Sequence, residues 1–314
     1  MPFVPKKQAF NAHINEVVLG VGEKATAIGG QNVLPFHSFD AEIKNAPKIG
    51  VELTDFGMSE YTMPGEQAFY AGCETVVDMA KRAETMEGAD FLCLHFEGAD
   101  PNGANKSVEE CVALAKAVSD AVTMPIVIMG CKNIEKDAEL FTKVSEALQG
   151  KNILVFSARE ENYKSVGASA VMAYGQKVGA ESAVDINLAK QLNVLMTQLG
   201  VAPTSIVMNA GSAAAGYGYE YVASTLDRIR AAALAQSDTQ LQMPILTPVS
   251  PETWSVKESM VSEADMPEWG SAEERGIEME ITTAAACLAG GSDAVIMRHP
   301  AAIKAISEMI EALV

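Results

Sequence analysis

The chain has 314 residues, of which 48% are hydrophobic and 20% charged, a composition typical of a folded globular protein rather than a disordered one. Asp and Glu number 41 against 23 Lys and Arg, so the formal net charge is −18. This acidic excess argues against binding to nucleic acids or anionic membrane surfaces, both of which need a basic footprint. The length allows two ordinary domains or one large α/β barrel.

The N-terminal region, residues 1 to about 40, predicts an extension that precedes the main domain. Its first residues, Met1 to Lys7, lack the apolar run of a signal peptide, and no stretch of the sequence is apolar enough to span a bilayer. We therefore expect a cytoplasmic protein. Two short apolar runs, residues 17–21 and 25–29, flank Gly22-Glu23-Lys24 and predict a β-hairpin. We expect this hairpin to plug the floor of the domain formed by residues 41–314.

One pattern recurs through residues 41–314: a short apolar run, a loop rich in Gly, Asn, Ser and Asp, and then an amphipathic helical segment. Continuous apolar runs are typical of strands buried on both faces of a parallel sheet. Eight runs predict strands at residues 48–53, 90–96, 125–129, 152–156, 170–173, 205–208, 244–246 and 294–297. The helical segments are predicted at residues 65–88, 107–122, 136–148, 183–199, 219–235, 272–288 and 301–313.

Eight strands that alternate with helices predict a fold of the α/β class, a TIM (β/α)8 barrel with an N-terminal hairpin extension. One connection fits poorly, because residues 159–165 leave room for only about two helical turns. The alternative is an open doubly wound sheet. That fold would need a glycine-rich phosphate loop after an early strand, and the sequence has neither G-x-G-x-x-G nor a Walker A motif.

The connection from residue 249 to residue 270 is far longer than the usual loop between a strand and a helix. It contains Pro251, Trp254, Pro267 and Trp269. We expect this loop to cap the barrel mouth or to contact a partner.

The loops after the predicted strands are the places to look for function, because active sites of TIM barrels lie at the carboxyl ends of the strands. Amides, hydroxyls and small residues dominate these loops, which favours a large ligand rich in hydrogen-bonding groups. In residues 209–219, Asn-Ala-Gly-Ser-Ala-Ala-Ala-Gly-Tyr-Gly-Tyr, the small side chains would let a flat ligand approach the backbone. The alternative interpretation of this segment is a flexible loop.

Several titratable residues each allow two interpretations. Asp55 and Glu97 follow the first two strands and could form a carboxylate pair for proton transfer or for a pterin-like ring, or could simply cap the next helices. His95 lies inside a predicted strand, as either a satisfied core histidine or a ligand. Arg159 could form an internal ion pair or contact an anion or partner. His299, next to Arg298, could face a ligand or begin a helix.

The sequence contains no recognisable nucleophile motif and no metal-ligand spacing. Five cysteines are dispersed without a C-x-x-C pair, which is typical of reduced, buried thiols. We therefore assign no catalytic residue and no metal ligand to this chain.

Four segments carry a resemblance to a known family: Val51-Glu52-Leu53-Thr54-Asp55, residues 156–163 (Phe-Ser-Ala-Arg-Glu-Glu-Asn-Tyr), residues 209–221, and residues 295–300 (Val-Ile-Met-Arg-His-Pro). Together they resemble the small (delta) subunit of the corrinoid iron–sulfur protein of the carbon monoxide dehydrogenase/acetyl-CoA synthase system. The resemblance covers essentially the whole chain.

The resemblance implies a subunit of a methyl-group carrier in the acetyl-CoA pathway of carbon fixation, with no chemistry of its own. Its barrel mouth would help to enclose cobalamin held by a large subunit, which would also carry a [4Fe-4S] cluster, in a heterodimer. Methyl groups would come from methyltetrahydrofolate through a methyltransferase and go to acetyl-CoA synthase. The expected cofactor-binding residues are Asp55, Ser157, Arg159, Asn162, Asn209, Gly211, Ser212, Tyr217, Arg298 and His299.

Two other functions remain open from the residues alone. A pterin-dependent methyltransferase with the same barrel would use Asp55 and Asn209 to hold the pterin ring, but the Asp and Asn residues are scattered and form no recognisable pterin signature. A barrel that acts on sugars or acids is the third option. It lacks an obvious Schiff-base lysine at a strand end, because Lys132 lies in a loop.

Overall fold

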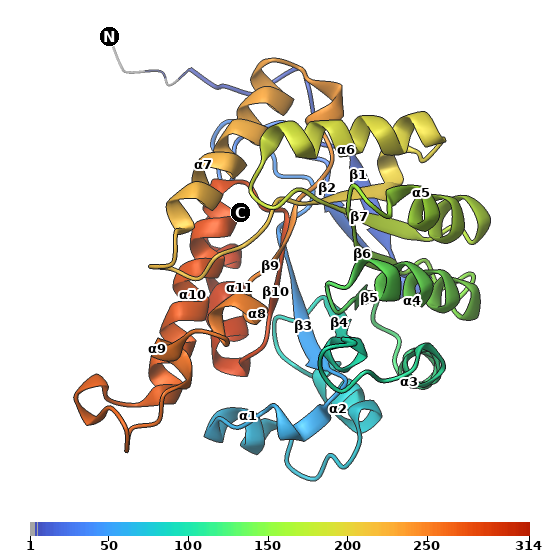
Figure 1. Cartoon of the computed structure of the whole chain (residues 1–314). Helices are drawn as coiled ribbons and strands as arrows, with labels where there is room; N and C mark the ends of the chain where they lie inside the picture. Colours follow the sequence, from blue (N-terminus) through green and yellow to red (C-terminus); the bar gives the residue numbers. More distant parts are fainter. Residues whose placement is uncertain (1–3, 5) are drawn as a thin grey trace.

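The computed structural model describes residue 4 and residues 6–314 of the chain, and in this part eight parallel strands form a barrel surrounded by helices (Figure 1). The strands are β3 (Lys48–Thr54), β4 (Phe91–His95), β5 (Ile126–Met129), β6 (Leu154–Ala158), β7 (Lys177–Glu181), β8 (Ile206–Asn209), β9 (Leu246–Pro248) and β10 (Ala294–Met297). The sheet runs from β8 through β3 to β9, and a parallel bridge between Met208 and Ile245 joins its two edges. This closure confirms the predicted TIM barrel, and the doubly wound alternative is wrong.

Six of the seven predicted helical segments are confirmed, whereas the predicted helix at residues 65–88 is wrong, because a turn at residues 70–75 divides it into two short helices and the second ends at Ala83. The helices are α1 (Pro64–Phe69), α2 (Val76–Ala83), α3 (Val108–Ala121), α4 (Ile134–Ala147), α5 (Tyr163–Val166), α6 (Ile186–Leu199), α7 (Tyr219–Arg230), α8 (Ser250–Thr253), α9 (Lys257–Met260), α10 (Ala272–Gly290) and α11 (Pro300–Leu313). Capping boxes at Thr75 and Ser107 fix where α2 and α3 start, because each hydroxyl accepts a hydrogen bond from a backbone N–H of the first turn. None of the described helices is long and apolar enough to cross a membrane.

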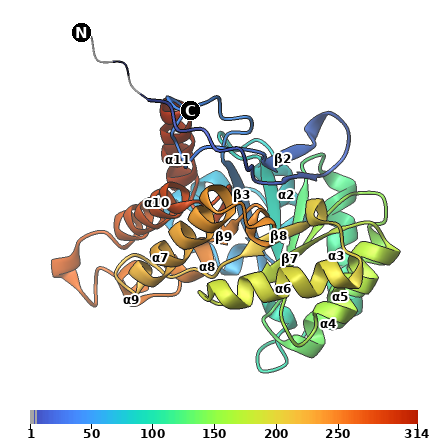
Figure 2. The same ribbon diagram turned by 90° about the horizontal axis from the view of Figure 1, so that it is seen from above.

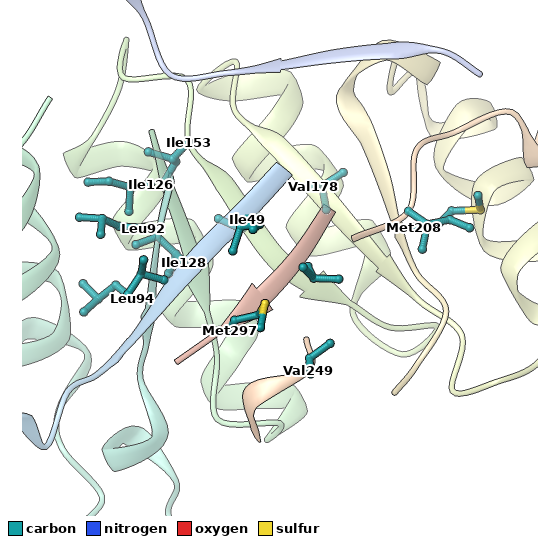
Figure 3. Close-up of a cluster of buried hydrophobic side chains, with 14 of the residues drawn as sticks. Ile49, Leu92, Leu94, Ile126, Ile128, Ile153, Val178, Met208, Val249 and Met297 are labelled. Atoms are coloured by element: carbon teal, nitrogen blue, oxygen red, sulfur yellow. The ribbon is translucent and has the colours of Figure 1, made fainter. Parts of the chain in front are cut away.

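The outward-facing side chains of the strands pack against the helices, and alternation along each strand sends the next side chain into the barrel. Ile49, Leu92 and Ile128 belong to the outer layer, which Figure 3 shows between the sheet and its helices. The inner layer contains large rings beside glycines. A Cβ atom on Gly50 would overlap the ring of Phe91, its partner on the neighbouring strand, so the glycine leaves the space that the ring fills.

The predicted fifth strand is wrong. Residues 170–173 lie in a helical segment, Gly167–Ala173, that continues α5. The strand itself is β7, which begins at Lys177, four residues after the predicted strand ends. The other seven strand predictions are confirmed to within two residues at each end. The correction also explains the short connection, since residues 159–176 now hold a full helical layer between β6 and β7.

The predicted N-terminal hairpin is confirmed, with β1 (Glu16–Leu19) paired antiparallel to β2 (Thr26–Gly29). Val17, Leu19 and Ile28 are buried in the inner layer of the barrel. The N–H of Gly20 donates to the carbonyl oxygen of Asn152 at 2.9 Å, just before β6 begins. The hairpin therefore closes the amino-terminal end of the barrel; Figure 2 shows the dark blue N-terminal segment crossing that side.

Candidate functional site

The carboxyl-terminal end of the barrel contains a cavity of about 220 Å³. Phe156 and Met129 contribute apolar surface to its wall, which also contains polar side chains from four strands: His95, Ser157, Glu181 and Asn209. The cavity lies where TIM barrels carry their active sites.

Strand alternation explains why these polar groups meet. In β4, Cys93 faces the inner layer, so His95, two residues later, also faces inward at the carboxyl end. In β8 the same spacing links Val207 to Asn209. In these two strands the inner layer changes from apolar to polar over one step, whereas in β6 a register shift between Val155 and Ala158 lets both Phe156 and Ser157 line the cavity.

A continuous hydrogen-bond chain orients one side of the cavity. The Asn209 amide donates to Ser157 Oγ at 3.1 Å, and the Ser157 hydroxyl donates to Glu181 Oε2 at 2.7 Å. The other carboxylate oxygen, Oε1, accepts from the Arg159 guanidinium at 2.7 Å. The N–H of Gly211 donates to Asn209 Oδ1 at 3.1 Å, which fixes the orientation of the amide. Each side chain is held in place and still has hydrogen-bonding capacity left for a ligand.

His95 lines the opposite side, with its Nδ1 atom 2.7 Å from Glu52 Oε1. Burial opposes charge on both groups, but their mutual hydrogen bond and attraction outweigh it. As a result the pKa of Glu52 is lowered and the pKa of His95 is raised. The Nε2 atom has no hydrogen-bond partner among the described residues. The interpretation of His95 as a satisfied core histidine is confirmed by its pairing with Glu52, and a ligand contact stays a prediction.

A second acid, Asp137 on α4, reaches the cavity from behind β5. Its Oδ1 atom accepts the N–H of Cys131 at 2.8 Å and the Cys131 thiol at 3.3 Å. Burial raises the pKa of Asp137 despite these hydrogen bonds. At the rim, Lys132 Nζ lies 3.4 Å from Glu252 Oε1 of α8. With Glu181 and Arg159 behind, the surroundings of the cavity hold acidic and basic groups in near balance.

Of the residues expected to bind a cofactor, Ser157, Asn209, Gly211 and Ser212 line this cavity. Arg159 stands behind Glu181 and also donates to the carbonyl oxygen of Lys132 at 3.3 Å, so the internal ion pair expected for it is confirmed.

Asp55 and Asn162 shape neighbouring loops. Asp55 Oδ1 accepts the N–H of Gly98 at 2.8 Å and its Oδ2 lies 3.1 Å from Lys106 Nζ, which holds the loop after β4. Asn162 Oδ1 accepts the N–H of Arg159 at 2.8 Å, and its amide donates to the carbonyl oxygen of Ile134, the first residue of α4, at 3.2 Å. Because Asp55 is engaged in this way and does not line the cavity, the structure gives no support to a pterin grip by Asp55 and Asn209.

The remaining three candidates lie outside the cavity wall. Tyr217 is exposed, and its hydroxyl donates to Glu258 of α9. Arg298 is buried, and its Nε atom donates to Glu66 Oε1 at 2.7 Å. His299 caps the start of α11 through Nδ1, which accepts the N–H of Ala301 at 3.2 Å, as the helix-start interpretation expects. A cofactor contact by any of the three stays a prediction.

The long connection after β9 divides into two parts. Pro251 and Glu252 of α8 line the cavity, so this part caps one side of the mouth as expected. The α9 helix packs along α10, and residues 262–270 extend away from the barrel (Figure 1).

Within residue 4 and residues 6–314, no group of three or more His, Cys, Asp or Glu side chains is placed to hold a metal ion. The five cysteines are free thiols dispersed over β4, α3, α10 and two loops.

The comparisons with known proteins give the family. The family described as CO dehydrogenase/acetyl-CoA synthase delta subunit matches residues 16–309, nearly the whole chain. The chain belongs to this delta-subunit family. The acetyl-CoA decarbonylase/synthase complex subunit delta of Archaeoglobus fulgidus is 30% identical over 99% of this chain and 71% of its own length. The subunit of the same name from Methanothermobacter thermautotrophicus is 30% identical over 98% of this chain and 78% of its own.

Solved structures similar to this member of the delta-subunit family are dihydropteroate synthases. The enzyme from Thermus thermophilus superposes with a TM-score of 0.56 at 12% identity, over 95% of this chain and 100% of its own. The enzyme from Xanthomonas albilineans also has a TM-score of 0.56, at 14% identity over 85% of this chain and 93% of its own. At this identity the likeness shows the barrel fold and nothing about the ligand.

Proposed function

We propose that this chain is a non-catalytic subunit of a corrinoid iron–sulfur methyl carrier, within a complex of the kind named in its relatives. Its barrel mouth would cover a corrinoid, cobalamin, held mainly by a larger subunit. Methyl groups would pass from methyltetrahydrofolate, through a methyltransferase, to acetyl-CoA synthase in the cytoplasm. The observation that carries the proposal is the mouth itself: a polar, charge-balanced cavity in a chain of the delta-subunit family.

The size of the cavity fits a covering role. Sites that enclose drug-sized ligands measure roughly 300–1,000 Å³, and a cavity of about 220 Å³ cannot take in a corrin macrocycle. The mouth can instead contact the amide-bearing edge of the macrocycle, to which Asn209 and Ser157 offer donors and acceptors. Ser212 supports this fit, because its buried Oγ has no hydrogen-bond partner among the described residues. A bound corrinoid would supply the cobalt that carries the methyl group.

The side chains near the mouth also avoid competing for a methyl group. The nearest thiol is that of Cys131, and burial, together with the charge of Asp137, raises its pKa to about 12. At neutral pH it stays a protonated thiol, which is a poor nucleophile. The role of this chain is then to exclude water and to supply fixed hydrogen-bonding groups.

The [4Fe-4S] cluster is expected on the larger subunit. Such a cluster needs grouped thiolates, whereas the cysteines of this chain are dispersed over β4, α3, α10 and two loops.

The visible absorption spectrum tests the proposal. The chain would be purified alone and after co-expression with its larger iron–sulfur partner, and each sample would be titrated with cobalamin. We expect corrinoid absorption only in the complex, and a complex that loses corrinoid faster when this chain is removed. Methyl transfer from methyltetrahydrofolate by the isolated chain, or a cofactor bound equally well without this chain, would contradict the proposal.

A further inference from the structure

The cavity wall offers unused hydrogen-bonding groups on buried side chains. His95, Ser157 and Asn209 are 7%, 8% and 6% exposed, and all three line the cavity. His95 Nε2 has no partner within the described part of the chain, and neither has the buried Oγ of Ser212. A buried polar atom without a partner is costly, so Ser212 Oγ indicates a ligand that completes its hydrogen bonds, and His95 lines the same cavity.

The charges around the cavity argue against an anionic ligand. Glu181 is paired with Arg159 at 2.7 Å, and Lys132 at the rim is paired with Glu252. The buried Asp137 adds a further acidic group to the wall. An added anion would face the carboxylate of Glu181 without a free cation beside it. A neutral group with an acceptor on one side and N–H donors on the other would match His95 and Ser212 as donors and Glu181 as acceptor.

We propose that the cavity is the binding site for one primary carboxamide arm of the corrinoid. The arm's carbonyl oxygen accepts from His95 and Ser212, and its NH₂ group donates to Glu181. The inference rests on the proposed function, since the corrinoid must lie over the mouth. The volume is suitable, because a cavity of about 220 Å³ has the space of roughly seven waters at ~30 Å³ each, enough for a short amide chain and not for the ring that carries it.

An Asn or Gln side chain of the partner subunit carries the same chemical group, so the experiment must separate the two sources. It uses the complex of this chain with its cofactor-free larger subunit. The probes are intact cobalamin and the cobalamin derivatives in which a single carboxamide has been hydrolysed to a carboxylate. Binding is measured by the change in the visible spectrum.

In the wild-type complex we expect one of these monocarboxylates to bind at least tenfold more weakly than intact cobalamin, because its carboxylate meets Glu181. The Glu181→Gln variant removes this repulsion and should reduce the difference for that same derivative to less than threefold. The matched control is Glu97→Gln, an equal charge change at an exposed residue of the same barrel end, outside the cavity. It should leave the tenfold preference unchanged.

A second variant, Ser212→Ala, tests the inference independently in case Glu181→Gln disturbs folding. It removes an unpartnered hydroxyl, so the complex should form normally and bind intact cobalamin severalfold more weakly. The inference is overturned if all monocarboxylates bind the wild-type complex alike, or if Glu181→Gln leaves their order unchanged. It is also overturned if these variants weaken assembly with the cofactor-free partner instead, which would identify a protein side chain as the occupant. A complex that binds no cobalamin at all would overturn the proposed function as well.

Discussion

Glu52 lies in the middle of β3 and orients one wall of the polar end of the barrel. Its side chain is 3% exposed, and His95 is its hydrogen-bonded partner of opposite charge. A buried carboxylate that loses its partner is costly, whereas a neutral pair of similar shape is tolerated. The orientation of His95 in the cavity therefore comes from a residue that a ligand would never touch.

We expect His95→Leu to lower the free energy of unfolding by about 3–5 kcal/mol, because it leaves the Glu52 charge buried and unpaired. In the Glu52→Gln background the same change should cost much less. Urea denaturation of the wild type, both single variants and the double variant at pH 7 measures this coupling. Equal costs of His95→Leu in the two backgrounds would show that the ion pair contributes nothing.

At the scale of elements, the hairpin β1–β2 belongs to the barrel core. Leu19 is fully buried among the inner-layer side chains, while Val18, its neighbour on the same strand, is 39% exposed. The two side chains point to opposite faces of β1, while their backbones belong to the same strand. They therefore allow the packing of the hairpin to be measured separately from its strand propensity.

Leu19→Ala should destabilise the protein by about 2–5 kcal/mol, since it leaves a void in the floor of the barrel. Val18→Ala should change stability by no more than about 0.5 kcal/mol, as is usual for an exposed position. Thermal and urea unfolding of the two variants would check this. If both substitutions had the same effect, the hairpin would be an appendage and not a part of the core.

The same scale explains what could be predicted from the sequence. Apolar runs such as residues 126–129 are continuous because those strands are buried on both faces, so the barrel and most of its strand ends followed from the pattern. Strand β7, Lys-Val-Gly-Ala-Glu, has charged ends and a central glycine, and only its neighbours β6 and β8 make it a strand. A Cβ on Gly179 would overlap Phe156, a requirement of packing that no local pattern reveals.

The wrong prediction of the fifth strand also left part of the site unpredicted. Ser157 and Asn209 follow correctly placed strands and were predicted, whereas Glu181 ends the strand that the sequence did not reveal. Glu52 lay within a predicted strand, but the pattern could not tell which way it faces. Asp137 reaches the cavity from a helix, so a search restricted to strand ends could not find it.

At the scale of the whole molecule, one buried network joins elements from both halves of the chain. Arg298, after β10, pairs with Glu66 of α1, and its guanidinium lies 4.3 Å from the ring centre of Tyr61. Glu280 of α10 accepts the N–H of Arg298 at 2.6 Å and that of His299 at 3.1 Å. Burial raises the pKa of Glu280 to about 8, despite these hydrogen bonds. The protonation of one side chain is thus linked to the packing of β10, α1 and α10.

This linkage gives a pH prediction. The pKa of Glu280 is higher in the folded protein, about 8, than the ordinary value of 4.5, so folding binds a proton between these pH values. The stabilisation is fully present below pH 4.5 and is lost as the pH rises through 8. Glu280→Gln can accept only one of the two N–H groups and should start below the wild type near pH 5, but it should lose no further stability towards pH 9, whereas the wild type should lose roughly a few kcal/mol.

Unfolding curves of both proteins from pH 5 to pH 9 would test this prediction. Glu278→Gln, on the same helix, is a matched control that should leave the pH dependence unchanged. Parallel pH profiles for the wild type and Glu280→Gln would contradict it.

Because the hairpin closes the amino-terminal end of the barrel, a ligand reaches and leaves the polar side chains through one entrance, the carboxyl-terminal mouth. Under the proposed function, a methyl donor protein and a methyl acceptor protein would compete for this entrance, because both could not bind there at once. They would then bind alternately, and a large excess of either protein should inhibit methyl transfer.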